Sequence, residues 1–460
     1  MAFLLEGNTI SFFDNSIDEE NSLLPSAFED AARIREPIDA LVECSLPTRC
    51  QQAIFHVTGW PSIKGNALLF KVTEYVTWPE EANLNKLESV SFTGPCINSF
   101  KPKQCSIALD ALKVSIPSPE TTKISGGTAK ILGRNVTLES IAGYRFSGDR
   151  QELVFTSTVK ANVCDADLKF LRELYLTVRG AIEFCIGRSN LEISASLDFD
   201  NALVSGDYVA FRDPAAIPDE LDGFNEQFVR ADDIGESLSL VLEAICSKKI
   251  EHLSFSSSRY DSNILTRTKV IELTAAFESE FAHTFSEGVV HSERTQRARE
   301  EAEVKIREIV ERLMEESEEP PADLLNEVAC LSEYERLHER TIEAIKSAMD
   351  GANRKVKSEL KKALNEMLRD SLQSRIKYAL EKSAPEVSDA CKRGIDLFDN
   401  NFGKAIADAR NKIAHSSEGE KLIYNARGEY LMLRRLVFAM QLMRAGFENC
   451  EVERLVMLMP

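Results

Sequence analysis

The first half of the chain carries short runs of β-branched and aromatic residues, separated by turns that are rich in proline and glycine. Such runs predict β-strands, because branched and aromatic side chains fit the pleated, half-buried surface of a sheet. The predicted strands cover residues 53–57, 68–77, 87–92, 105–116, 152–163, 191–199 and 202–211. This succession of strands and turns predicts an antiparallel, sandwich-like β assembly.

One helical pattern interrupts the strands. Apolar residues recur there at intervals of three and four, at Leu168, Leu171, Leu174, Val178 and Ile182. Asp165 is the expected N-cap of this helix, and Gly187 is its expected end.

The second half of the chain has the apolar spacing of helices, beginning after a linker with proline and acidic residues at 213–222. Its stripes lie at Val270, Leu273, Phe277 and Phe281; at Ile306, Ile309, Val310 and Leu313; at Val356, Leu360, Leu364, Leu368, Leu372, Ile376 and Leu380; and at Tyr430, Leu433, Leu436, Val437, Met440 and Met443, where Gly446 ends the last long helix. The expected fold class is α+β, with a β-rich domain at residues 1–263 and an all-α bundle at residues 264–460.

The candidate chemistry lies on one of these helices, within the stretch Arg410-Asn411-Lys412-Ile413-Ala414-His415. Its apolar stripe is formed by Phe402, Ile406, Ala409 and Ile413. A helix turns by about 100° per residue, so Asn411 and His415 face away from this stripe while Arg410 flanks it. The residues that follow, Ser-Ser-Glu-Gly at 416–419, predict that the helix ends close to His415.

The three polar residue types suit the cutting of RNA. Arginine binds phosphate through a two-pronged fork, and a histidine exchanges protons near neutral pH. The negative end of a helix dipole favours the protonated imidazole, as expected for His415. A surface helix with a capping histidine has the same sequence pattern, so this second interpretation stays open at this point.

With this layout the chain resembles the ApeA-like anti-phage proteins, in which a β-rich N-terminal domain precedes a C-terminal HEPN domain. The resemblance rests on Ala276-Phe277-Glu278 in the first helix of the second half, on Arg410 to His415 as a form of the family's R-x4-6-H motif, and on the closing apolar helix at residues 430–447. Asn411, directly after the arginine, resembles the ribonuclease version of that motif.

The resemblance implies a metal-independent endoribonuclease without a cofactor, which cleaves tRNA or other cellular RNA in abortive-infection defence. It also implies a homodimer or a higher even oligomer through the HEPN domain, and an N-terminal domain that senses infection or restrains cleavage, with a phage-encoded trigger as its partner. His415 would then be the general acid or base, Arg410 the phosphate clamp and Asn411 the orienting group. Lys412 is a further expected RNA contact.

The net charge of the chain bears on which kinds of nucleic-acid-binding protein it can be. The chain has 55 basic and 74 acidic residues, a net charge of −19, which excludes a general coat protein of nucleic acid held by long-range attraction. A local excess of basic residues at 351–380, which includes Arg375 and Lys377, still allows a local RNA site. The ten cysteines include no C-x-x-C pair and no apolar run reaches membrane-spanning length, so we expect reduced thiols, a cytoplasmic location and no membrane.

Other polar stretches have simpler explanations. Residues 125–130, Ser-Gly-Gly-Thr-Ala-Lys, share only composition with a phosphate-binding loop and predict a hairpin turn. Asp198, Asp200 and Asn201 predict a polar turn at the end of a strand. A different function also remains open: a non-catalytic, dimeric helical module that binds RNA, a nucleotide or a partner protein.

Overall fold

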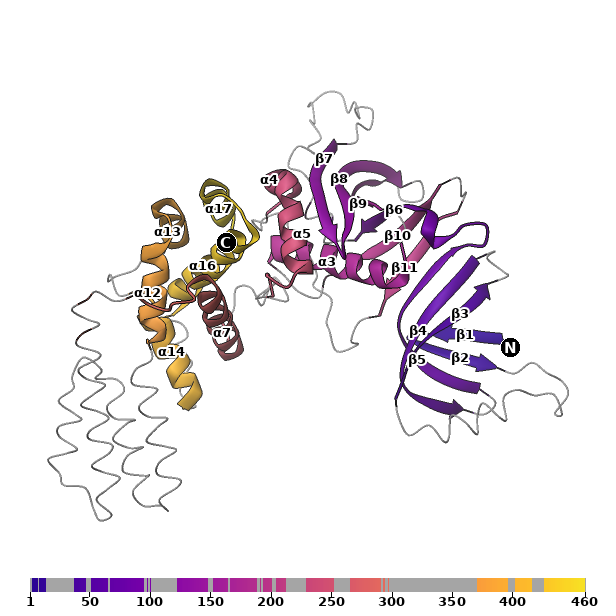
Figure 1. Cartoon of the computed structure of the whole chain (residues 1–460), viewed down its shortest axis with the longest axis horizontal. Helices are drawn as coiled ribbons and strands as arrows, with labels where there is room; N and C mark the ends of the chain where they lie inside the picture. The colour runs from indigo at the N-terminus through magenta and orange to yellow at the C-terminus, as the bar shows by residue number, and fades with distance from the viewer. Residues whose placement is uncertain are drawn as a thin grey trace, which may run out of the picture.

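The computed structural model describes residues 2–6, 8–13, 37–46, 51–64, 67–94, 97, 100, 122–147, 152–163, 166–187, 191, 193–200, 204–211, 229–251, 265–290, 293, 297, 370–395, 402–415 and 426–459. A β-rich part occupies one side of the molecule and a group of helices the other, with α3, α4 and α5 between them (Figure 1). The chain is therefore α+β, as the sequence predicts. No helix in the described ranges is long and apolar enough to cross a membrane.

The described strands form one antiparallel sheet. They are β1 (Ala2–Glu6), β2 (Thr9–Phe13), β3 (Ile38–Leu46), β4 (Gln51–Lys64), β5 (Ala67–Pro79), β6 (Leu87–Thr93), β7 (Thr122–Ile131), β8 (Arg134–Ser147), β9 (Glu152–Asn162), β10 (Ser194–Phe199) and β11 (Gly206–Ala210). The sheet branches at β5, which pairs with β4 along one edge. Its other edge pairs first with β2 and further along with β11.

This branching corrects the sandwich-like expectation. A sandwich has two separate sheets, whereas here hydrogen bonds connect every described strand into one sheet with the order β1-β2-β5-β11-β10-β6-β9-β8-β7, and β4 and β3 on the other side of β5. The physical reason is the length of β5, because 13 residues give one edge enough room for two short partners.

Six of the predicted strands correspond to β4, β5, β6, β9, β10 and β11. The sequence analysis missed β1, β2, β3, β7 and β8. In β7 and β8 polar and charged residues separate the apolar ones, and exposed positions alternate with buried ones there. The predicted strand at residues 105–116 lies outside the described residues.

The hairpin turn expected at residues 125–130 is wrong. These residues lie inside β7, where the register with β8 shifts between Ser125 and Thr128, and the turn itself follows at Leu132 and Gly133. Gly127 has a φ of +75°, and a Cβ built on it would lie only 2.5 Å from the backbone oxygen of Glu236. Glycine is therefore required here because another backbone passes directly over the bulge.

The long helix of the first half is α3 (Leu168–Ile186). Its N-cap is Asp167, whose side chain accepts the backbone N–H of Phe170 at 2.7 Å, rather than the expected Asp165. Asp165 itself lies outside the described residues. The expected end at Gly187 is confirmed, because this residue adopts the left-handed conformation with a φ of +65°.

The helices of the second half are α7 (Arg267–Thr284), α12 (Leu372–Lys382), α13 (Pro385–Lys392), α14 (Lys404–His415), α16 (Arg427–Ala445) and α17 (Asn449–Val456). The predicted stripes of α7, of α16 up to Met440, and the described part of the 356–380 stripe are buried, while Met443 is partly buried. Gly446 ends α16 as expected. Two short helices, α13 and α17, were missed, so α16 is not the last helix. The stripe at residues 306–313 lies outside the described residues.

A single hydrophobic core joins the sheet to the helices. Short helices α4 (Ala231–Ile234) and α5 (Leu238–Cys246) pack between them, and α5 contacts β7, α3 and α16. The rings of Phe184 on α3 and Phe438 on α16 lie 4.7 Å apart. Both residues belong to one buried cluster that runs from the sheet into the helices. The expected domain boundary at residues 263 and 264 lies outside the described residues.

We expect Gly127→Ala to lower the free energy of unfolding by about 2–4 kcal/mol, because left-handed strain and a backbone clash add together. Gly133→Ala is the matched control, since its φ is also positive but a Cβ there meets nothing within 4 Å. That variant should lose about 1 kcal/mol. Urea unfolding followed by circular dichroism measures both, and equal losses would show that the close approach at Gly127 is unimportant.

Candidate functional site

Helix α14 has the orientation that the sequence predicts. Ile406 and Ala409 are completely buried, and Phe402 and Ile413 pack against the same core. Asn411 is exposed on the outer side, and Arg410 lies between these extremes. The candidate polar face of α14 therefore points away from the core.

The start of α14 is held by a carboxylate from another helix. Glu429, near the start of α16, is mostly buried and accepts the backbone N–H of Ile406 at 2.9 Å. Burial raises the pKa of Glu429, while hydrogen bonds from the backbone N–H groups of Ile406, Ala405 and Gly403 act in the opposite direction. A carboxylate at this end also interacts favourably with the helix dipole. Glu429 therefore fixes where α14 begins and how it lies on α16.

Arg410 is paired with a glutamate on α7. The guanidinium of Arg410 lies 3.3 Å from one carboxylate oxygen of Glu278, and Arg375 on α12 lies 3.1 Å from the other. Three helices that are far apart in the sequence thus meet at one carboxylate. Exposure increases along this cluster, from 15% at Arg375 through 27% at Glu278 to 40% at Arg410.

Two guanidinium groups therefore contact the same carboxylate, and we call these three residues the Arg375–Glu278–Arg410 cluster. The more exposed arginine is the one on the motif helix, directly beside Asn411. Arginine retains N–H donors after it binds one carboxylate, and it can present them to a phosphate oxygen.

The structure brings together only part of the predicted site. Arg410 is half-buried beside α7, Asn411 is exposed on the outer side of α14, and the backbone of Lys412 and His415 belongs to the same helix. The side chains of Lys412 and His415 lie outside the described residues. Glu278 and Arg375 join Arg410, and of these the sequence analysis had singled out Glu278 for its resemblance and Arg375 only as part of a basic stretch.

A second ion pair fixes α7 against α16. Glu280 is 1% exposed, and its carboxylate accepts hydrogen bonds from Arg444 and, at 3.4 Å, from Gln441. Two residues along a helix differ by about 200°, so Glu278 and Glu280 face different neighbours. The sequence analysis missed this pair. The sequence signal that could have found it is an acidic residue, Glu280, within the apolar stripe of α7, together with Arg444 beside the apolar stripe of α16.

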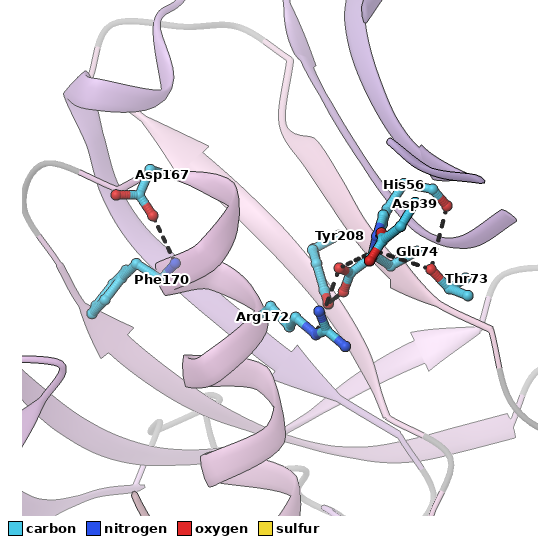
Figure 2. A network of polar contacts seen from close by, with 8 residues as sticks. All are labelled: Asp39, His56, Thr73, Glu74, Asp167, Phe170, Arg172 and Tyr208. Carbon is cyan, nitrogen blue, oxygen red and sulfur yellow. Dashed lines mark hydrogen bonds and ion pairs between the residues drawn. The ribbon is translucent and has the colours of Figure 1, made fainter. Parts of the chain in front are cut away.

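A separate polar network lies in the β-rich part, where β3, β4, β5 and β11 meet α3 (Figure 2). His56 contacts Asp39 through Nε2 at 2.6 Å and Glu74 through Nδ1 at 3.1 Å. Glu74 is buried and also accepts a hydrogen bond from Tyr208, and Arg172 lies 3.6 Å away. Burial raises the pKa of Tyr208 far above its ordinary value, so its hydroxyl remains a donor.

This network has a structural explanation in the bulge of β5. The register of β4 and β5 shifts beside His56, so that Thr73 and Glu74 both reach the ring, and the Thr73 hydroxyl lies 3.1 Å from Nδ1. The two carboxylates bind opposite sides of the imidazole and do not converge. No group of three or more potential metal ligands occurs among the described residues.

Comparison with models of protein families, with curated proteins and with solved structures finds no match to this chain.

We expect Glu429→Gln to be tolerated better than Glu429→Leu, because glutamine keeps an acceptor for the start of α14. Leucine leaves buried N–H groups without a partner, at a cost of about 1–3 kcal/mol in the free energy of unfolding. Urea unfolding of both variants at neutral pH measures the difference. Equal stability would show that Glu429 does not hold α14.

The stability of the unmodified protein relative to Glu429→Gln should depend on pH, and the direction of the shift in the pKa of Glu429 sets the sign. Because the pKa of Glu429 is raised in the folded state, its favourable contribution is complete below about pH 4, the ordinary range of a glutamate, and is lost as the pH rises through the folded pKa. Glu429→Gln does not titrate. The stability of the unmodified protein relative to this variant should therefore fall between acidic and neutral pH.

Proposed function

We propose that this protein is a metal-independent endoribonuclease of the HEPN type, with Arg410, Asn411 and His415 as its catalytic residues. The single observation that carries the proposal is the position of Arg410. It lies at the flank of α14, next to exposed Asn411 in the chain, and Glu278 of α7 holds it together with Arg375.

Cleavage of RNA requires the protein to supply only proton transfer and stabilisation of the developing charge. RNA carries its own nucleophile, the 2′-hydroxyl, next to each phosphate. His415 at the end of α14 takes or gives the proton, and Arg410 stabilises the charge that develops on the phosphorus oxygens. Asn411 orients His415 or the scissile phosphate, and Lys412 contacts the RNA.

The exposure of Arg410 supports an anionic ligand at this place, because its guanidinium is 40% exposed although it contacts Glu278. Glu278 keeps Arg410 oriented before RNA arrives, which lowers the entropy that binding must remove. A phosphodiester beside Arg410 would accept hydrogen bonds from the guanidinium N–H groups that do not contact Glu278.

The oligomer belongs to the same proposal. Attack and departure in an in-line displacement occur on opposite sides of the phosphorus, while one chain supplies one His415 and one Arg410. A homodimer, or a higher even oligomer, would bring two copies of the motif to one cleft. In this proposal tRNA or another cellular RNA is cut during anti-phage defence, and the β-rich half restrains the activity or binds a phage-encoded trigger.

We expect His415→Ala to abolish RNA cleavage, because general acid–base catalysis contributes roughly 100- to 10,000-fold. The assay incubates total tRNA with the purified protein in excess chelator and identifies products that end in a 2′,3′-cyclic phosphate. His283→Ala is the matched control, since His283 is an exposed histidine in the last turn of neighbouring α7.

Unchanged cleavage by His415→Ala would overturn the catalytic assignment. Binding of RNA by the unmodified protein without strand scission, both in buffer and in extract from infected cells, would favour the non-catalytic binding module. Circular dichroism and light scattering of each variant separate a loss of chemistry from a loss of folding or assembly.

Arg410→Ala should weaken RNA binding as well as cleavage, and Arg410→Lys should restore binding more than cleavage. Lysine keeps the charge but loses the planar fork that grips a phosphate. The slope of log affinity against log salt should fall by about 1 in Arg410→Ala, as expected for one lost phosphate contact. Lys249→Ala removes an equally charged, exposed residue that follows α5, outside the basic stretch and α14, and serves as the control.

A further inference from the structure

The outer edge of β3 is the feature that carries a second inference. β3 pairs with β4 along its whole length, from Ile38 opposite Gly59 to Leu46 opposite Gln51. Within the ranges that the structure describes, no strand pairs with its other edge. An edge strand presents a row of backbone N–H and C=O groups, and such a row is a template for an added strand.

The side chains of β3 alternate in the way that an interaction strand requires. Ala40, Val42, Cys44 and Leu46 pack against the smaller core cluster of the sheet. Asp39, Leu41, Glu43 and Ser45 point to the opposite face and are exposed. Leu41, in the middle of the strand, is 58% exposed, so its side chain is accessible to an added strand.

A second exposed apolar side chain lies at one end of this edge. Trp60 is 60% exposed, and it follows Gly59, which pairs with Ile38 at the start of β3. It therefore lies at the same end of the strand as Asp39. An exposed indole near a carboxylate suits a lysine or arginine, which can interact with the ring face and the carboxylate together.

The charges of β3 select the kind of strand that fits. Asp39 and Glu43 flank Leu41 on the same face, and no basic residue lies in β3. If two copies of β3 paired antiparallel about Leu41, Asp39 would lie opposite Glu43; about Glu43, the two Glu43 side chains would face each other. Directly opposed like charges destabilise a strand pair. Basic residues opposite these two positions would stabilise it.

We propose that β3 is a docking edge for an extended basic segment of a partner protein, which adds to the sheet as an antiparallel strand. Its recognition pattern is a basic residue, any residue, an apolar residue, any residue and a second basic residue. The basic residues lie opposite Glu43 and Asp39, and the apolar residue lies opposite Leu41. Main-chain hydrogen bonds provide the pairing, and these side chains select the partner.

Hydrogen bonds hold the Asp39 side chain of β3 in place before any partner binds. His56 on β4 binds Asp39, and Glu74 on β5 binds the other side of the same ring (Figure 2). Glu74 is in turn fixed by Tyr208 and Arg172, so the position of Asp39 is tied to β11 and α3. Asp39 nevertheless remains 80% exposed. A rigid strand with an accessible carboxylate has less freedom to lose on binding.

The test uses the full chain and two blocked peptides, Lys-Val-Leu-Val-Lys and Glu-Val-Leu-Val-Glu. Hydrogen exchange should show slower exchange of the amides of residues 38–46 with the basic peptide only, and titration followed by tryptophan fluorescence gives the affinities. Binding of the basic peptide without protection of β3 would indicate non-specific attraction to an acidic protein and would overturn the proposal. Absence of binding would overturn it as well.

Charge reversal supplies the matched variants. Glu43→Lys should lower the affinity for the basic peptide by roughly five-fold and raise the affinity for the acidic peptide, because one cross-strand charge pair changes from attractive to repulsive or the reverse. Glu88→Lys, at an exposed position of interior strand β6, changes the net charge equally and should leave both affinities unaltered. An equal effect of the two variants would show that only net charge matters, and would contradict docking at β3.

Discussion

The arrangement of the helices depends on one buried carboxylate, that of Glu280. A charged group that is 1% exposed is tolerated only when it is paired and hydrogen-bonded, and Arg444 with Gln441 supplies that pairing. This requirement fixes the rotation and the register of α7 against α16. Once α7 is fixed, Glu278 has to emerge on another side of the helix, where α12 and α14 pass. The position of Arg410 thus follows from the burial of a residue that does not touch it.

Polar and aromatic contacts also fix α16 against α3, which packs on the sheet. Arg434 on α16 donates to the backbone oxygen of Gly187 at 3.4 Å, immediately after α3, and Phe184 packs on Phe438. Helix α5 lies between the two parts and needs the glycines of β7 in order to approach the sheet. Helix α16 therefore contacts α3 and α5 on one side, and through Glu429 it binds the start of α14 on another.

The sequence predicted the α+β class, the buried stripes of α7 and α16, and the outward face of α14 in advance. These features depend on local periodicity, and periodicity is visible in a single sequence. It did not predict that β5 branches the sheet, because pairing partners are set by distant segments. Nor did it predict that Ser125 to Lys130 forms a bulged strand. Glycine is required there because the backbone of Glu236, more than 100 residues away in the chain, leaves no space for a Cβ atom.

The candidate site was predictable only in part, for the same reason. Spacing placed Asn411 on the outward face and Arg410 at the flank of the apolar stripe, and the family resemblance pointed to Glu278. Spacing contains no information about which cation meets which anion across helices, so the place of Arg375 and the role of Glu429 became visible only in three dimensions. The short helices α13 and α17 were missed because eight residues hold too few turns for a clear period.

The Arg375–Glu278–Arg410 cluster joins two guanidinium groups to one carboxylate, whereas His56 in the β-rich part lies between two carboxylates. Over the whole chain the net charge is −19, so long-range attraction favours a basic ligand and opposes RNA. Screening at physiological salt limits such fields to about 8 Å. An RNA site on this protein therefore has to act by contact, through arginines set within hydrogen-bonding distance, and an acidic strand edge attracts a basic segment through its own nearby carboxylates.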